Sequence, residues 1–213
     1  MAGAVVGVVG GSGGSGASTF AAALATCLGG PSVLVDVDPV GGGIDVLLGI
    51  EGSSGARWSE LHLGGGRLDP AVLDAGLPRW GEVRVLAADT APAPEAVPQV
   101  LEAAVELGPV VLDVPRAPGE LRDAALRCCH LVAVVAYGSV AGIAAARRVI
   151  ASLPDVPVGV VLRRGSVGPL DAAELLDVPV LASLAEPLRG RGVPAAWIRT
   201  GRAVFDGLLS GAV

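Results

Sequence analysis

The stretch Gly-Gly-Ser-Gly-Gly-Ser-Gly-Ala-Ser-Thr-Phe, residues 10–20, decides the fold of this chain. An apolar run from Ala4 to Val9 precedes it, and a helix-like run from Ala17 to Leu28 follows it. A strand, a glycine loop and a helix in this order form the setting of a phosphate-binding loop. Glycines let backbone N–H groups point inward, and the helix N-terminus adds partial positive charge. The stretch therefore predicts an anion site at the start of the first helix.

The rest of the chain alternates between short apolar runs and helix-like segments. We expect strands at 5–9, 32–37, 83–87, 110–114, 131–136, 156–162 and 178–181, and helices at 17–28, 69–75, 94–106, 119–128, 140–152, 170–176 and 201–210. Continuous apolar strands are buried on both faces, and intervening helices connect parallel neighbours. The sequence predicts a single α/β domain over residues 1–213, with a doubly wound, mostly parallel sheet.

The glycine loop lacks the residue that usually completes it. A standard phosphate loop ends in Gly-Lys-Ser/Thr, and its lysine reaches the β- and γ-phosphates. Here the loop ends in Gly16-Ala17-Ser18-Thr19, and all 15 basic residues of the chain are arginine. No lysine can therefore take over this contact. The loop predicts nucleotide binding but leaves three alternatives open: a hydrolase, a switch or a relic.

Aspartates follow two of the expected strands. Asp36 and Asp38 lie at the end of the 32–37 run, and Asp113 lies near the end of the 110–114 run. Two carboxylates at positions i and i+2 suit metal coordination and the positioning of a water molecule. An acid that ends an apolar strand is typical of a Walker B site, which holds Mg²⁺. Ser18 supplies a hydroxyl for the same ion.

A dinucleotide site is the competing interpretation. Residues 11–16 also satisfy the pattern G-x-G-x-x-G, and Asp36 lies 20 residues beyond Gly16. In a Rossmann fold, an acid at this distance binds the ribose of the cofactor. The serine and threonine after the glycines, together with Asp38 and Asp113, favour the phosphate-loop interpretation.

Together, these motifs resemble those of the MinD/ParA group of deviant Walker A ATPases. The group's loop reads Lys-Gly-Gly-x-Gly-Lys-Ser/Thr-Thr, and residues 12–19 align with it on their glycines, with Ser12 and Ala17 in place of the two lysines. Residues 33–48 resemble the group's second motif, and residues 113–116 its Walker B strand. Within the group, the lysine-less loop resembles the CpaE/TadZ-like branch, which includes actinobacterial septum-site-determining (Ssd-type) proteins. Such proteins often carry an N-terminal receiver-like domain, which we do not expect here.

The resemblance assigns roles to individual residues. Ser18 and Asp113 would serve Mg²⁺, and Asp38 would position the attacking water if the protein is active. ATP or ADP, weakly bound, would contact Gly13, Gly14, Ser15, Gly16, Ala17, Ser18, Thr19 and Asp36. The group's adenine-contacting segment often contains an asparagine, whereas this chain has Leu162-Arg163-Arg164-Gly165 near that point.

The resemblance also implies a function and its alternatives. The first hypothesis is a regulatory nucleotide-binding switch or scaffold with weak or no ATPase activity, which positions secretion/pilus or division-septum machinery. The second is a genuine ATPase in which an arginine, such as Arg116, replaces the loop lysine. The third is a Rossmann dinucleotide-binding protein. We expect a homodimer that contacts protein partners through the glycine-loop face.

Charge and hydropathy limit the other partners. A net charge of −6 argues against specific nucleic-acid binding, so we expect both arginine pairs, Arg147-Arg148 and Arg163-Arg164, to be solvated. The first 35 residues carry no charge, but glycines and serines interrupt them, and no basic segment precedes them. We expect a cytoplasmic protein, recruited to the pole, the septum or the inner membrane face. A helical stripe in 197–209 could contact membrane, but a core-facing stripe is favoured.

Overall fold

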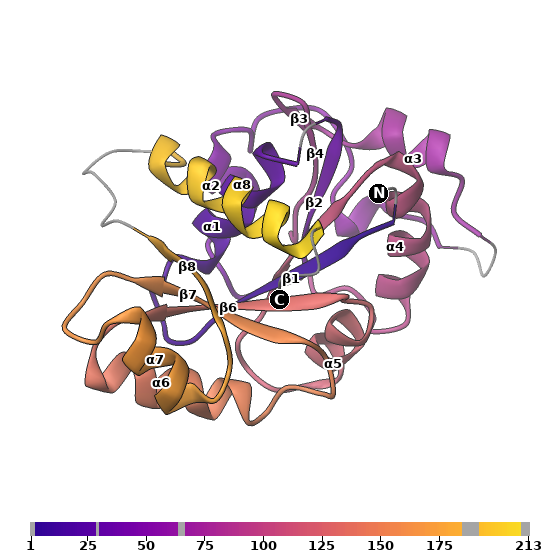
Figure 1. Ribbon diagram of the computed structural model, residues 1–213. Coiled ribbons are helices and arrows are strands. Elements are labelled where there is room, and N and C mark those ends of the chain that lie inside the picture. Colours follow the sequence, from indigo (N-terminus) through magenta and orange to yellow (C-terminus); the bar gives the residue numbers. More distant parts are fainter. Residues whose placement is uncertain (1–2, 29, 64–66, 185–191, 210–213) are drawn as a thin grey trace.

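The computed structural model describes residues 3–28, 30–63, 67–184 and 192–209. Among these residues, eight strands form one sheet in the order β3-β4-β2-β5-β1-β6-β7-β8 (Figure 1). All neighbouring strands are parallel except β3 and β4, which pair antiparallel. The doubly wound, mostly parallel α/β fold expected from the sequence is confirmed.

The elements follow the expected alternation closely. The strands are β1 (Val5–Gly10), β2 (Ser32–Asp36), β3 (Arg79–Trp80), β4 (Val83–Leu86), β5 (Val110–Val114), β6 (Leu131–Tyr137), β7 (Val158–Arg163) and β8 (Val180–Leu184). The helices are α1 (Ala17–Thr26), α2 (Ile44–Leu48), α3 (Pro70–Gly76), α4 (Ala96–Leu107), α5 (Glu120–Arg127), α6 (Val140–Ile150), α7 (Pro169–Leu176) and α8 (Ala195–Leu209), with a 3₁₀ turn at Trp58–Glu60.

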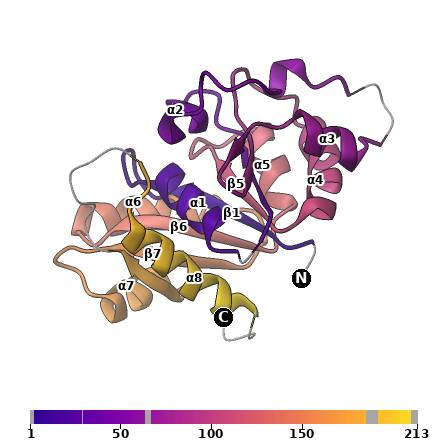
Figure 2. The same cartoon turned by 90° about the horizontal axis from the view of Figure 1, so that it is seen from above.

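Two apolar layers enclose the sheet, one on each face. Helices α1, α2 and α8 cover one face, and α3 to α7 cover the other (Figures 1 and 2). Successive strand residues alternate between the layers: in β1, Val6 and Val8 face α1, whereas Val5 and Val9 face the opposite side. Burial on both faces explains why these strands read as continuous apolar runs.

The strand order places a crevice at one point of the sheet. From β1 the chain crosses through α1 to β2, while from β5 it crosses β1 in the opposite direction to reach β6. Helices that start from neighbouring strands and leave toward opposite ends of a sheet open a crevice at the carboxyl ends of those strands. The glycine loop after β1 and the aspartates of β2 and β5 lie at this end.

The structure differs from expectation mainly at the ends of elements and in short pieces. Two short elements, α2 and β3, were not predicted from the sequence; they are five and two residues long. The last helix was expected to begin at residue 201, whereas α8 starts at Ala195, directly after Pro194.

The apolar stripe of α8 faces the core. Trp197, Val204 and Phe205 are buried against the layer that contains α1. The side chains of Leu208 and Leu209, which were expected to continue the stripe, lie outside the described residues. None of the helices in the described part of the chain has the length and apolar character needed to cross a membrane.

Candidate nucleotide-binding site

The glycine loop leaves β1 and enters α1 in a conformation that only glycine adopts easily. Gly14 has a φ of 70° and Gly16 a φ of 89°, in the left-handed region. Gly16 is the residue before α1, and no side chain caps the amides of that helix. The first turn of α1 also lacks acidic residues. Its N-terminal N–H groups are therefore available to an anion, and the helix dipole favours negative charge there.

A pocket of about 590 Å³ opens over this loop. All of the nucleotide-binding, metal and catalytic residues named from the sequence line it: Gly13, Gly14, Ser15, Gly16, Ala17, Ser18, Thr19, Asp36, Asp38 and Asp113. They come from three places in the chain, namely the loop with α1, the end of β2 and the end of β5. The structure thus brings all of these predicted site residues together in one pocket.

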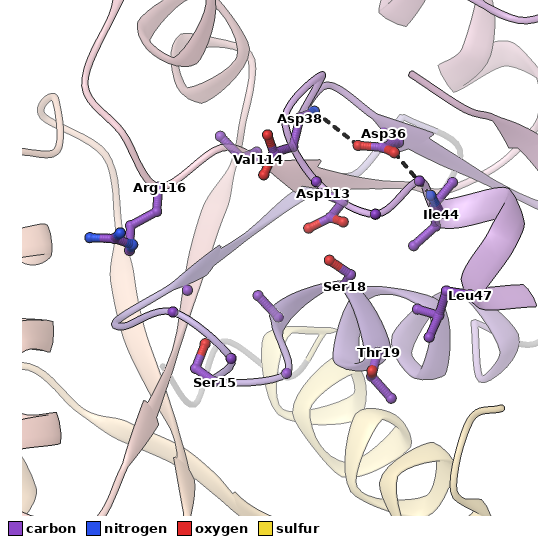
Figure 3. Close-up of a pocket in the computed structure, with 18 of the residues that line it drawn as sticks. Ser15, Ser18, Thr19, Asp36, Asp38, Ile44, Leu47, Asp113, Val114 and Arg116 are labelled. Carbon is purple, nitrogen blue, oxygen red and sulfur yellow. Dashed lines mark hydrogen bonds between the residues drawn. The ribbon is translucent and has the colours of Figure 1, made fainter. Parts of the chain in front are cut away.

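Asp36 and Asp113 lie side by side. They are paired residues on adjacent parallel strands, and their side chains are 2% and 4% exposed. Burial, together with the charge of the neighbouring Asp36, raises the pKa of Asp113 to about 8, and a hydrogen bond with Ser18 opposes this shift. Figure 3 shows the Asp113 carboxyl group above the Ser18 hydroxyl at the start of α1. The side chains of Asp113 and Ser18 thus face each other across the floor of the pocket.

Asp36 is held by the loop that follows it. Its two carboxylate oxygens accept hydrogen bonds from the amides of Asp38 (2.9 Å) and Ile44 (3.2 Å), drawn as dashed lines in Figure 3. The Trp58 indole donates to the Asp36 carbonyl oxygen at 2.7 Å. Burial raises the pKa of Asp36 to about 6, and the backbone amides of Asp38 and Ile44, with a weaker contribution from the Ala88 backbone, oppose this shift. The loop 37–43 is thereby fixed over the pocket, with half-buried Asp38 at its edge.

These residues fit a nucleotide with Mg²⁺ better than a metal ion alone. Within the described residues, no group of three or more His, Cys, Asp or Glu side chains is placed to hold a metal. Mg²⁺ usually takes one or two carboxylates and completes its shell with phosphate oxygens and water. The Asp113 carboxyl and Ser18 hydroxyl groups are of the kind that would contribute to such a shell, and both line the pocket beside the loop amides. A divalent cation would also offset the repulsion between the two buried carboxyl groups.

The pocket has features that the sequence analysis missed or left unplaced. Gly41 to Gly43 and the first turn of α2, including exposed Val46, form one wall. Arg116, which could not be placed from sequence, is exposed and lies at the opposite rim; its side chain points away from the carboxylates (Figure 3). The carbonyl oxygen of Arg116 accepts a hydrogen bond from buried Arg122 at 3.3 Å. The position of Arg116 at the rim depends on the packing of the β5–α5 connection, and no sequence pattern predicts it.

One prediction about the arginines was wrong. Arg163 and Arg164 were expected to be solvated together, but only Arg164 is exposed, while the Arg163 side chain is 5% exposed. Residues of a strand alternate between faces, so neighbours in β7 and just after it point in opposite directions. Arg163 points to the glycine loop and donates hydrogen bonds to its carbonyl oxygens. A lone buried arginine at a strand end has no signature that could have separated it from its exposed neighbour.

Comparisons with known proteins agree with the fold. In the MinC:MinD cell division complex of Aquifex aeolicus, a chain with 19% identity has a TM-score of 0.78, with 95% of this chain and 96% of that chain covered. A ParA family ATPase from Chlorobium tepidum gives 0.75 at 17% identity, with 96% and 91% covered. MinD of Pyrococcus horikoshii, solved with Mg-ADP, gives 0.69 at 18% identity, with 98% of both chains covered. The fold is that of the MinD/ParA-type P-loop ATPases.

The sequence comparisons add relatives without a described activity. The uncharacterized protein Rv3660c of Mycobacterium tuberculosis is 41% identical over 192 residues, and so is an uncharacterized protein of a second strain of that species. The match covers 85% of this chain but 54% of each relative. The chain therefore spans about half the length of the curated relatives it matches. No family model matches the sequence.

Proposed function

We propose that this chain is a nucleotide-binding domain of the MinD/ParA type, in its CpaE/TadZ-like, septum-site-determining branch. It acts as a regulatory switch or scaffold with weak or no ATPase activity and positions secretion/pilus or division-septum machinery. One observation carries the proposal: a glycine loop without lysine opens α1 in the same pocket as Asp36, Asp38 and Asp113. The glycine loop and the aspartates are groups that bind a nucleotide with Mg²⁺, whereas the missing lysine is a group that accelerates hydrolysis.

In this proposal the residues of the pocket divide the work of binding. The amides of the loop and of the first turn of α1 bind phosphate oxygens. Ser18 and Asp113 hold Mg²⁺, whose chemistry when bound is to neutralise charge on the phosphates. Asp36 keeps the loop 37–43 closed over the pocket through its two amide contacts. Asp38 positions the attacking water if hydrolysis occurs.

The missing lysine has a calculable effect on affinity. A charge-assisted hydrogen bond contributes about 1.5–3 kcal/mol net. This corresponds to a loss of roughly 10- to 150-fold in affinity, since about 1.4 kcal/mol is one factor of ten. Binding survives such a loss at the nucleotide concentrations of a cell. Hydrolysis suffers more, because the lysines of related loops stabilise charge that develops in the transition state.

Calorimetric titration with ADP, ATP and NADH, each with and without Mg²⁺, tests this function. We expect Mg²⁺-dependent binding of ADP and ATP, no binding of NADH and little phosphate release. Ala17→Lys restores the missing cation and should tighten ATP binding by one to two orders of magnitude. Ala144→Lys, which adds the same charge on an exposed face of α6, should leave binding unchanged. Binding of NADH in preference to ATP would overturn the proposal.

An active ATPase is the second candidate, and the position of Arg116 favours it. Arg116 lines the pocket at the rim opposite the α2 wall, so a rotated side chain would direct its charge into the pocket. Robust Mg²⁺-dependent turnover that is lost in both Arg116→Ala and Asp38→Ala would favour this candidate over the switch. Arg147→Ala, on α6, is the control for loss of an exposed arginine.

The dinucleotide hypothesis has less support. A ribose needs an accessible carboxylate, whereas Asp36 is 2% exposed and its two oxygens are directed to the backbone amides of Asp38 and Ile44. Asp113 and Ser18 have no role in that hypothesis, although they line the same pocket.

The proposal also includes a homodimer and protein partners that meet the glycine-loop face, in a cytoplasmic protein recruited to pole, septum or inner membrane face. Exposed Val40 and Val46 beside the pocket give this face apolar contact area. Analytical ultracentrifugation with and without ATP and Mg²⁺ tests the dimer. A strict monomer at high concentration, combined with Val40→Asp and Val46→Asp variants that keep full partner binding, would exclude this part of the proposal.

A further inference from the structure

One cationic and two aromatic side chains contact the outer side of the glycine loop. Arg163, at the end of β7, donates from Nη1 to the carbonyl oxygens of Ser15 (3.2 Å) and Gly14 (3.4 Å). The Tyr137 hydroxyl, at the end of β6, donates to the same Gly14 carbonyl at 2.9 Å and also accepts a hydrogen bond from Arg163. The guanidinium carbon lies 4.2 Å from the centroid of the Tyr137 ring and 5.5 Å from that of Trp197. None of these three side chains lines the pocket on the inner side of the loop.

The peptide geometry connects this outer contact to the pocket. In a trans peptide the N–H group points opposite to the C=O group. The carbonyl of Ser15 shares its peptide unit with the amide of Gly16, and Gly16 lines the pocket. A cation bound to that carbonyl therefore directs the Gly16 amide inward and polarises it. The Ser15 amide is engaged differently, because it closes a turn onto the Ser12 carbonyl at 3.3 Å.

Helix α8 supports the same loop from behind. A Cβ atom on Gly16 would lie 2.8 Å from the Trp197 ring, so the indole packs directly on the last glycine of the loop. Further along α8, Gly201 packs equally closely on α1: a Cβ there would lie 2.8 Å from the Cys27 sulfur and 3.1 Å from the Leu24 Cα atom. Figures 1 and 2 both show α8 running along α1. The loop and the helix it opens are thus held by one element.

We propose that Arg163 is a positioning residue that, with Tyr137 and Trp197, clamps the glycine loop from its outer side and holds the Gly16 amide toward a bound phosphate. This inference rests on the proposed nucleotide-binding function. A standard loop has a lysine on its inner side to organise the phosphates. This chain has none, and it places an arginine on the outer side, where the charge acts through the peptide unit and fixes its direction.

Binding measurements with matched arginine variants test the clamp. Arg163→Met removes the guanidinium, while Arg164→Met removes an equal charge from the exposed neighbour. We expect Arg163→Met to weaken ADP binding with Mg²⁺ by about tenfold, the effect of one charge-assisted hydrogen bond, and Arg164→Met to have no effect. Arg163→Lys keeps the charge without the planar fork and should recover part of the loss. Tyr137→Phe, which removes a single hydroxyl group, should weaken binding by about threefold and stays informative if Arg163→Met does not fold.

Relaxation of the glycine amide resonances tests the clamp without nucleotide. We expect the amides of Gly14 and Gly16 to be rigid in the wild type and in Arg164→Met, and mobile on the nanosecond timescale in Arg163→Met and, to a smaller degree, Tyr137→Phe. A merely structural contribution to the fold would lower the melting temperature without this local change.

The two measurements separate failure of the clamp from failure of the proposed function. Equal affinity and equal amide order in folded Arg163→Met and Arg164→Met would overturn the clamp and leave nucleotide binding intact. A wild type that binds no nucleotide, but whose loop order depends on Arg163, would overturn the proposed function and leave the clamp.

Discussion

Replacement of Asp113 by asparagine should stabilise the nucleotide-free protein at pH 8 and remove most of the stabilisation that a nucleotide with Mg²⁺ gives. In the folded protein, burial and the neighbouring Asp36 raise the pKa of Asp113 from 3.8 to about 8, and the pKa of Asp36 is raised to about 6. Between about pH 4, where such carboxyl groups ionise in the unfolded chain, and about pH 8, the folded state therefore binds more protons than the unfolded state. The contribution of these two carboxyl groups to the free energy of unfolding is fully present below about pH 4, and it is lost as the pH rises through about 6 and about 8. Asparagine has nearly the same shape and cannot ionise, so it escapes the part of this loss that Asp113 causes.

The size of the effect follows from the shift. One pKa unit corresponds to about 1.4 kcal/mol, so even a quarter of the shift of Asp113 gives a gain of roughly 1.4 kcal/mol at pH 8. The gain should approach zero at pH 4, where the carboxyl group is protonated in the wild type. A nucleotide with Mg²⁺ at about 100 times its dissociation constant stabilises the wild type by about 2.7 kcal/mol. Asp113→Asn should lose most of this increment, because it removes one of the two proposed ligands of the ion.

Urea unfolding followed by circular dichroism measures the free energy of unfolding of both proteins in four conditions, namely at pH 4 and at pH 8, each with and without Mg-ADP. Asp155→Asn, in the exposed turn before β7, is the control for loss of one negative charge and should change none of these free energies. The reasoning is refuted if Asp113→Asn is less stable than the wild type at pH 8, or if the difference does not change with pH.

Three further substitutions test the parts that hold the pocket. Gly16→Ala should lower the free energy of unfolding by at least about 1 kcal/mol in urea titrations, because alanine is strained at a φ of 89° and its Cβ atom meets the Trp197 ring; an unchanged midpoint would contradict the described loop. Trp58→Phe removes the indole hydrogen bond to the Asp36 carbonyl, and chemical unfolding should show a loss of about 1–3 kcal/mol. A value near zero would mean that water replaces this contact. Leu112→Ala opens a cavity in the central strand β5 and should cost about 2–5 kcal/mol, seen as a lower melting temperature; a smaller shift would indicate that the core collapses into the space.

Much of the fold was predictable because local patterns and tertiary needs coincide. The apolar run at 110–114 is β5 to the residue, and the runs at 5–9 and 131–136 each extend by one residue in the structure. Strands buried on both faces are apolar throughout, so the ends of an apolar run predict the ends of the strand. The short elements α2 and β3 were missed because neither is long enough to show a period.

The candidate site was predictable in composition but not in surroundings. Glycines, hydroxyls and strand-end carboxylates follow directly after strands, and parallel strands bring their carboxyl ends to one edge. This rule sufficed to group Ser18, Asp36 and Asp113 from sequence alone. Arg116 and Arg163 follow no such rule, because long side chains reach sites that depend on the path of loops and on the packing of neighbouring helices.

The sequence by itself determined the α/β class, the alternation of its longer strands and helices, the glycine loop and the absence of lysine. Each of these is a local property: periodicity, a turn that needs glycine, or the presence of a residue type. Only the tertiary structure decided that Arg163 is buried behind the loop while Arg164 is exposed, and that Trp197 packs on Gly16 across 180 residues of chain. These contacts join β6, β7 and α8 to the loop after β1, and the energies of such long-range packing have no counterpart in any local stretch of sequence.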